Sequence, residues 1–180
     1  MINIRIYLFL LCGTLIFSLL LREQGSPLTT SPFSPRGIID LELAKSIHQT
    51  EEVVAGWKVT GMLWTARKNI LLDFLFIPFY SLLFYTLCGS ISVRVSGTIS
   101  KLGVLLAFSS FIAAVLDVFE NILMLLSLSS FFSSLVSLLT FVLAVTKFFL
   151  LAVAVVYVII FGLKLIIAKL SGVPSHQHGL

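Results

Sequence analysis

Ionisable residues inside apolar stretches are the features of this sequence most able to do chemistry. Asp117, Glu120 and Asn121 follow one another at i, i+3 and i+4, so a helix places all three side chains on one side. Two further charged residues, Asp73 and Lys147, interrupt other apolar stretches. Charged groups inside a bilayer are costly unless they face one another, water or a ligand. We therefore expect these five residues to form one buried polar cluster.

The cluster has a structural and a functional interpretation. In the first, Lys147 pairs with Asp117 or Glu120 and fixes the order of the helices. In the second, three carboxylates against one cation leave an excess of acid, which could bind a cation, exchange a proton or hold a basic ligand group. Contact with a partner subunit is a third use of the same residues. The sequence leaves these alternatives open.

Five further residues are candidates to support the cluster. Asp73 and Asn121 need polar partners, and the candidates are Arg67 and Lys68, where the chain enters the second apolar run, and Tyr80 within that run. Two more lie on the polar loop that we expect to cover the cluster, Glu42 and Trp57. Tryptophan suits the headgroup level of a bilayer, where we expect Trp57 to lie.

The sequence offers little for enzyme or metal chemistry. Serines gather at 127–134, but no G-x-S-x-G or S-x-x-K motif accompanies them, and there is no glycine-rich phosphate loop. Carboxylates alone could hold Ca²⁺ or Mn²⁺, yet the histidines, His48, His176 and His178, all lie outside the apolar runs. We expect no enzyme, no metal site and no cofactor.

Four apolar runs must position the cluster. Each is long enough to cross a hydrocarbon core of ~30 Å, for which a helix needs ~20 residues. They run over about 5–21, 70–88, 102–126 and 135–167, and they predict an all-α integral membrane four-helix bundle. The chain 1–180 would then be a single membrane domain with a short tail at 168–180. The first run also resembles a signal-peptide core, but no clear cleavage site follows it, so we favour a retained anchor.

A polar loop at 22–69 separates the first two spans. It opens with a Ser/Thr/Pro-rich linker, after which Ser34 and Pro35 resemble a helix N-cap and the first helical residue. We expect an extra-membrane amphipathic helix to begin there, to break near Gly56 or Gly61, and to lie over the cluster.

Flanking charges indicate orientation and partners. Basic residues lie between the second and third spans and after the fourth, whereas the turn between the third and fourth has none, so the positive-inside rule puts the N and C termini in the cytoplasm. The 12 Lys and Arg are scattered, so the net charge of +4 does not indicate nucleic-acid binding. The expected partners are the lipid bilayer and, beyond it, another membrane protein or a second copy of the chain.

Short motifs are spread over the chain: L-D-F-L-F at 72–76, D-x-x-E-N at 117–121 and K-F at 147–148. Together they resemble an uncharacterised family of small bacterial four-span integral membrane proteins. The resemblance implies a shared architecture and polar set in a bacterial inner membrane, and no activity. We predict a multi-pass membrane protein whose cluster stabilises the bundle or docks a partner, the alternative being a small transporter or ligand-binding protein with a cation or proton site.

Overall fold

The protein is an all-helical bundle, as the sequence predicts. The computed structural model describes residues 3–171, and 85% of these residues are helical, with no strand among them. Four long helices are apolar enough to cross a membrane: α1 (Ile4–Gly25), α4 (Leu63–Ser92), α5 (Gly97–Leu128) and α6 (Ser134–Leu170). The end of the predicted tail, 172–180 with His176 and His178, lies outside the described residues.

The helices are longer than the predicted spans at both ends. The predicted bounds mark where the apolar composition stops, but backbone hydrogen bonding continues through polar residues for as long as the chain keeps helical angles. Thus α4 already includes Arg67 and continues across Pro78. α5 begins only at Gly97, whose positive φ of 63° turns the chain back.

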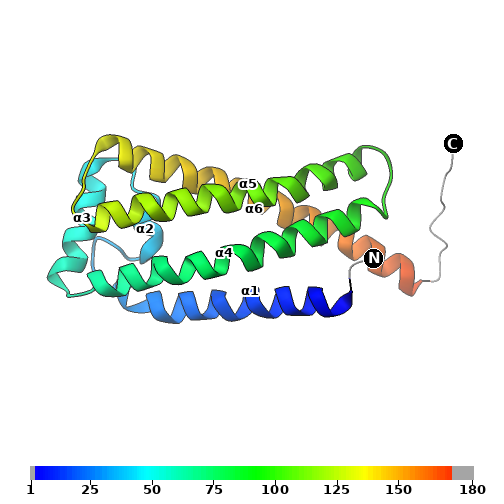
Figure 1. Ribbon diagram of the computed structural model, residues 1–180, viewed down its shortest axis with the longest axis horizontal. Helices are drawn as coiled ribbons and strands as arrows, with labels where there is room; N and C mark the ends of the chain where they lie inside the picture. Colours follow the sequence, from blue (N-terminus) through cyan, green and yellow to red (C-terminus); the bar gives the residue numbers. More distant parts are fainter. Residues whose placement is uncertain (1–2, 172–180) are drawn as a thin grey trace.

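Neighbours in the chain pack side by side: α1 on α4, α4 on α5, and α5 on α6 (Figure 1). α1 approaches α4 closely because Gly13 has no side chain where Phe79 lies. Because α4 and α5 each pack on two of the other long helices, they are the more buried pair, while α1 and α6 expose most of their apolar side chains. Such exteriors are those of helices that face lipid.

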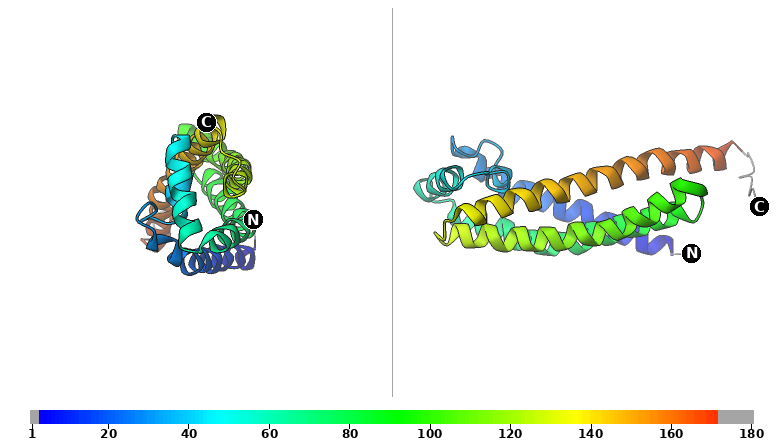
Figure 2. Two further views of the ribbon diagram at one scale, coloured as in Figure 1. Left: turned by 90° about the vertical axis from the view of Figure 1, so that its left-hand side faces the viewer. Right: turned by 90° about the horizontal axis from the view of Figure 1, so that it is seen from above.

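The polar loop folds into three short helices: η1 (Ser26–Thr30), α2 (Ile38–Glu42) and α3 (Ile47–Val59). Together they cover the end of the bundle opposite to Ile4 and Leu170 (Figures 1 and 2). A helix between the first two long helices is thus confirmed, and it ends just before Gly61 as expected, but it does not run unbroken from Pro35 because the chain breaks between α2 and α3.

The predicted helix start at Ser34 is also wrong. The Ser34 hydroxyl donates to the carbonyl oxygen of Leu28 over 2.8 Å and caps no helix. The chain turns instead at Gly37, whose φ of 66° favours glycine, and α2 starts at the next residue. The serine- and proline-rich segment is thus a packed turn rather than a linker.

Trp57 is fully buried inside the protein, so its ring is not exposed on the surface. Its indole Nε1 donates to the Leu28 carbonyl oxygen at 3.1 Å and to Ser34 Oγ at 2.8 Å. With these partners present, the ring can leave the water interface and pack in an apolar core. This cap core contains Leu28, Leu41, Val53, Val54, Trp57, Ala66, Ile70, Met124 and Leu128.

A second apolar core lies towards the other end of the bundle. This far core contains Cys88, Ile91, Leu106, Ala107, Ala154 and Tyr157, all from α4, α5 and α6. Small residues let these helices approach closely, as Gly103 does where it meets Tyr157. The polar residues of the sequence analysis lie between the two cores.

Candidate functional site

Lys147 is the centre of an ion-pair cluster. Its Nζ donates to Asp117 Oδ1 at 2.6 Å and lies 2.8 Å from Glu120 Oε2. A third carboxylate oxygen, Oε1 of Glu42, is 4.0 Å away. Lys147 is 4% exposed and Glu120 fully buried. The cluster therefore joins α6 to α5 and, more loosely, to α2.

The helical spacing on α5 explains how this cluster forms. Asp117, Glu120 and Asn121 are all buried, as expected for i, i+3 and i+4 positions on the face turned towards α4 and α6. Asp117 faces Lys147 with one oxygen and accepts a hydrogen bond from the Tyr80 hydroxyl with the other, at 2.7 Å. α4, α5 and α6 are thus linked through one carboxylate.

Asp73 and Asn121 form a separate pair. Asn121 Nδ2 donates to Asp73 Oδ2 at 2.7 Å. Within the described residues Asp73 makes no ion pair, and it is half-buried. The five residues of the predicted cluster therefore lie in one region but divide into a charged group around Lys147 and an uncompensated carboxylate beside an amide.

Three of the candidate supporting residues lie elsewhere. Arg67 donates to Ser129 Oγ at 3.3 Å and to the Leu128 carbonyl oxygen at 3.4 Å, at the end of α5. Lys68 is exposed, with its Nζ 5.5 Å from the ring centre of Trp64. Both residues are thus directed to partners other than Asp73, and Trp57 belongs to the cap core.

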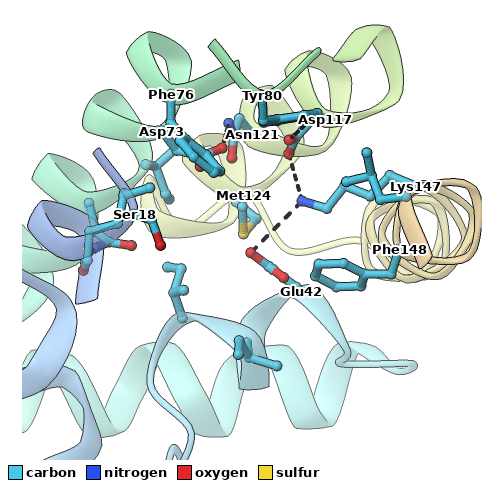
Figure 3. A pocket seen from close by; sticks show the side chains of 16 residues that line it. Ser18, Glu42, Asp73, Phe76, Tyr80, Asp117, Asn121, Met124, Lys147 and Phe148 are labelled. Atoms are coloured by element: carbon cyan, nitrogen blue, oxygen red, sulfur yellow. Dashed lines mark hydrogen bonds and ion pairs between the residues drawn. The ribbon is translucent and has the colours of Figure 1, made fainter. Parts of the chain in front are cut away.

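A cavity of about 380 Å³ lies beside the cluster (Figure 3). Asp73, Tyr80, Asp117 and Asn121 from α4 and α5 line its inner side. α1 and α6 form its two walls and α2 covers it, through Ser18, Leu21, Phe148, Leu151, Ile38, Ile39 and Glu42. This volume is within the range of small-molecule sites, roughly 300–1,000 Å³.

Glu42, which the sequence suggests only as a supporting residue, belongs to the site itself in the structure. It is 8% exposed and lines the cavity, and Oε2 has no hydrogen-bond partner among the described residues. Burial raises the pKa of Glu42 above its ordinary value of 4.5, Lys147 partly opposes this, and the nearby Asp117 adds to it. The spacing of Ile38, Ile39 and Glu42 is the signal that could have placed this carboxylate on the inner face of α2.

The site has more acid than base. Four carboxyl groups, those of Glu42, Asp73, Asp117 and Glu120, lie around the single ammonium group of Lys147. Glu120 Oε1 also lacks a hydrogen-bond partner within the described part of the chain. Within residues 3–171, no group of three or more His, Cys, Asp or Glu side chains is placed to hold a metal ion. The arrangement suits a cationic ligand or a proton.

Fold and site together define a helical bundle with four helices of membrane-crossing length and a buried acidic cavity between them. No protein-family model, curated protein or solved structure matches the chain.

Proposed function

We propose that this chain is a non-enzymatic, multi-pass integral membrane protein that binds a cation in the cavity between α1 and α6. The apolar exteriors of the four long helices support a membrane location. The flanking basic residues support cytoplasmic N and C termini, and the motif resemblance supports a bacterial inner membrane. The binding site then lies in the half of the membrane towards the outer surface, beneath α2.

The carboxylate excess carries this proposal. Lys147 neutralises Asp117 and Glu120 by direct pairs at 2.6 and 2.8 Å, whereas Glu42 is 4.0 Å from it. Among the described residues, the hydrogen-bond partner of Asp73 is the Asn121 amide. A buried carboxylate without a cation is costly, because desolvation is not repaid by any partner. A cation bound between Glu42 and Asp73 supplies the missing charge.

The Lys147 pairs have a different role from these two carboxylates. They connect α6 to α5, and Tyr80 extends the connection to α4, so they stabilise the arrangement of helices around the cavity. The bundle-stabilising interpretation of the sequence therefore applies to Lys147, Asp117 and Glu120. The binding interpretation applies to Glu42 and Asp73.

Binding of ethylammonium to the protein in phosphatidylcholine nanodiscs tests the proposal. Isothermal titration at constant ionic strength should show saturable binding to the wild type, lost in the double variant Glu42→Gln with Asp73→Asn. Amides keep the size of carboxylates but not their charge, so the helices should remain packed. Circular dichroism and the unfolding midpoint establish that they do.

Glu51→Gln provides the matched control, since this carboxylate is exposed on α3. It should bind ethylammonium as the wild type does. Equal binding by the wild type and the double variant would overturn the cation site. If the double variant has a lower unfolding midpoint and ethylammonium binding does not depend on the two carboxylates, the cluster has a purely structural role.

A further inference from the structure

The cavity opens sideways between two helices that do not form one of the main packed pairs. α1 packs on α4 and α6 packs on α5, and the cavity separates α1 from α6. Residues from each of the three surrounding helices stand exposed at its rim, namely Ser18, Ile39 and Phe148. Asp117 and Asn121, at the opposite side, are buried. A ligand can therefore reach the carboxylates from the lipid side.

The polar part of the cavity accepts hydrogen bonds and offers few. Glu42 Oε2 has no partner among the described residues, and Asp73 uses one oxygen for Asn121. The nearby donors are already engaged, since Tyr80 and Lys147 both donate to Asp117. A primary ammonium group has three N–H donors and a positive charge, whereas a quaternary one has no donor. The open acceptors favour the primary ammonium.

The walls of the cavity are apolar up to its rim. Leu21 of α1 and Leu151 of α6 line it, together with the exposed Ile39 and Phe148, and Figure 3 shows Phe148 beside Glu42. Beyond the rim both helices expose apolar side chains, which in a membrane contact lipid chains. A hydrocarbon chain leaving the cavity here would stay in an apolar environment along its whole length.

We propose that the cavity binds an amphiphile with a primary ammonium head, which enters between α1 and α6 from the bilayer. This inference rests on the proposed function and names its ligand class. The head lies between Glu42 and Asp73, and the hydrocarbon chain passes Ser18 and Phe148 into the lipid. A membrane lipid with a primary amine and a free long-chain amine share this chemistry.

Blocking the opening tests the inference. Ser18→Trp adds a large side chain at the rim, and Leu19→Trp adds one to an exposed position of the same helix that does not line the cavity. In phosphatidylcholine nanodiscs, Ser18→Trp should weaken dodecylammonium binding at least about tenfold, a loss that titration resolves easily. It should leave ethylammonium binding nearly unchanged, because the short probe needs no outlet for a chain. Leu19→Trp should affect neither probe.

Different results would overturn the amphiphile ligand and the cation site. If Ser18→Trp weakens both probes equally, or neither, or if only ethylammonium binds, the amphiphile inference is overturned and the cation site stands. If neither probe shows binding that depends on Glu42 and Asp73, the proposed function itself is overturned. Dodecyltrimethylammonium, which lacks N–H donors, should bind at least about tenfold more weakly than dodecylammonium, and equal binding would contradict the primary-ammonium head.

Native mass spectrometry then separates the two sources of the ligand. Protein purified from phosphatidylethanolamine-containing membranes should retain this lipid in the wild type but not in the double variant if the ligand is a membrane lipid. No retained lipid together with dodecylammonium binding assigns the site to a free long-chain amine. Either result supports the ligand class.

Discussion

The bundle has a cap half, which lies next to α2, and a far half, which surrounds the far core. Both halves are built from α4, α5 and α6, but one is polar inside and the other is apolar. Around the far core, α4, α5 and α6 pack closely through Ala107, Ala154 and Gly103. Nearer α2, the same helices enclose four carboxyl groups and one ammonium group. Small residues thus let the helices approach closely in the far half, whereas the ion pairs of Lys147 link α6 to α5 in the cap half.

Removing the ammonium group of Lys147, in the cap half, should have the largest effect on stability. Lys147→Met leaves Asp117 and Glu120 buried without their partner, which costs about 3–5 kcal/mol of unfolding free energy for a buried pair. Chemical unfolding in detergent micelles, followed by circular dichroism, measures this loss.

The matched rescue adds Asp117→Asn and Glu120→Gln to Lys147→Met. Neutral amides in place of the stranded carboxylates should restore most of the lost stability, because the penalty comes from unpaired charge. If Lys147→Met alone is as stable as the wild type, the ion pairs do not stabilise the cap half. The two halves would then not differ in their dependence on charge.

A single methyl group should disturb the far half by a smaller amount. In Gly103→Ala the new Cβ would lie against the Tyr157 hydroxyl and 2.8 Å from Ser92 Cβ, so overpacking should cost about 1–3 kcal/mol. Gly89→Ala is the control, since its Cβ would meet nothing within 4 Å. This substitution should raise the unfolding free energy by about 0.4–1 kcal/mol, because alanine lowers the conformational entropy of the unfolded chain. The same unfolding assay measures both, and equal effects would argue against close packing as the basis of the far half.

The smallest expected effect is a change in pH dependence. Burial raises the pKa of Glu42, with Lys147 opposing and Asp117 reinforcing the shift, so the folded protein holds this proton above pH 4.5, where the unfolded chain releases it. The contribution of Glu42 to stability is then complete below 4.5 and is lost as pH rises through the folded-state pKa.

Glu42→Gln removes this titration. Its unfolding midpoint in detergent should therefore rise relative to the wild type as pH increases from 4.5. The exposed control Glu51→Gln should follow the wild type at every pH. If the difference in unfolding midpoint between Glu42→Gln and the wild type does not change with pH, Glu42 is not an uncompensated acid.

The sequence by itself determined the helical class, the four long apolar helices and the shared face of Asp117, Glu120 and Asn121. These follow from local regularities, because hydropathy and helical spacing depend on residues a few positions apart. It also singled out Lys147, since an isolated charge in an apolar run stands out without any knowledge of its neighbours.

Only the tertiary structure decided the partners and the cavity. Gly37 turns the chain so that Glu42 reaches the cluster, Arg67 is directed to the end of α5, and Trp57 is buried on the carbonyl oxygen of Leu28. Each outcome depends on contacts between residues far apart in the chain, which local periodicity does not contain. The separation of α1 from α6 is of the same kind: it is set by how four helices pack, and it leaves Glu42 and Asp73 facing an open space.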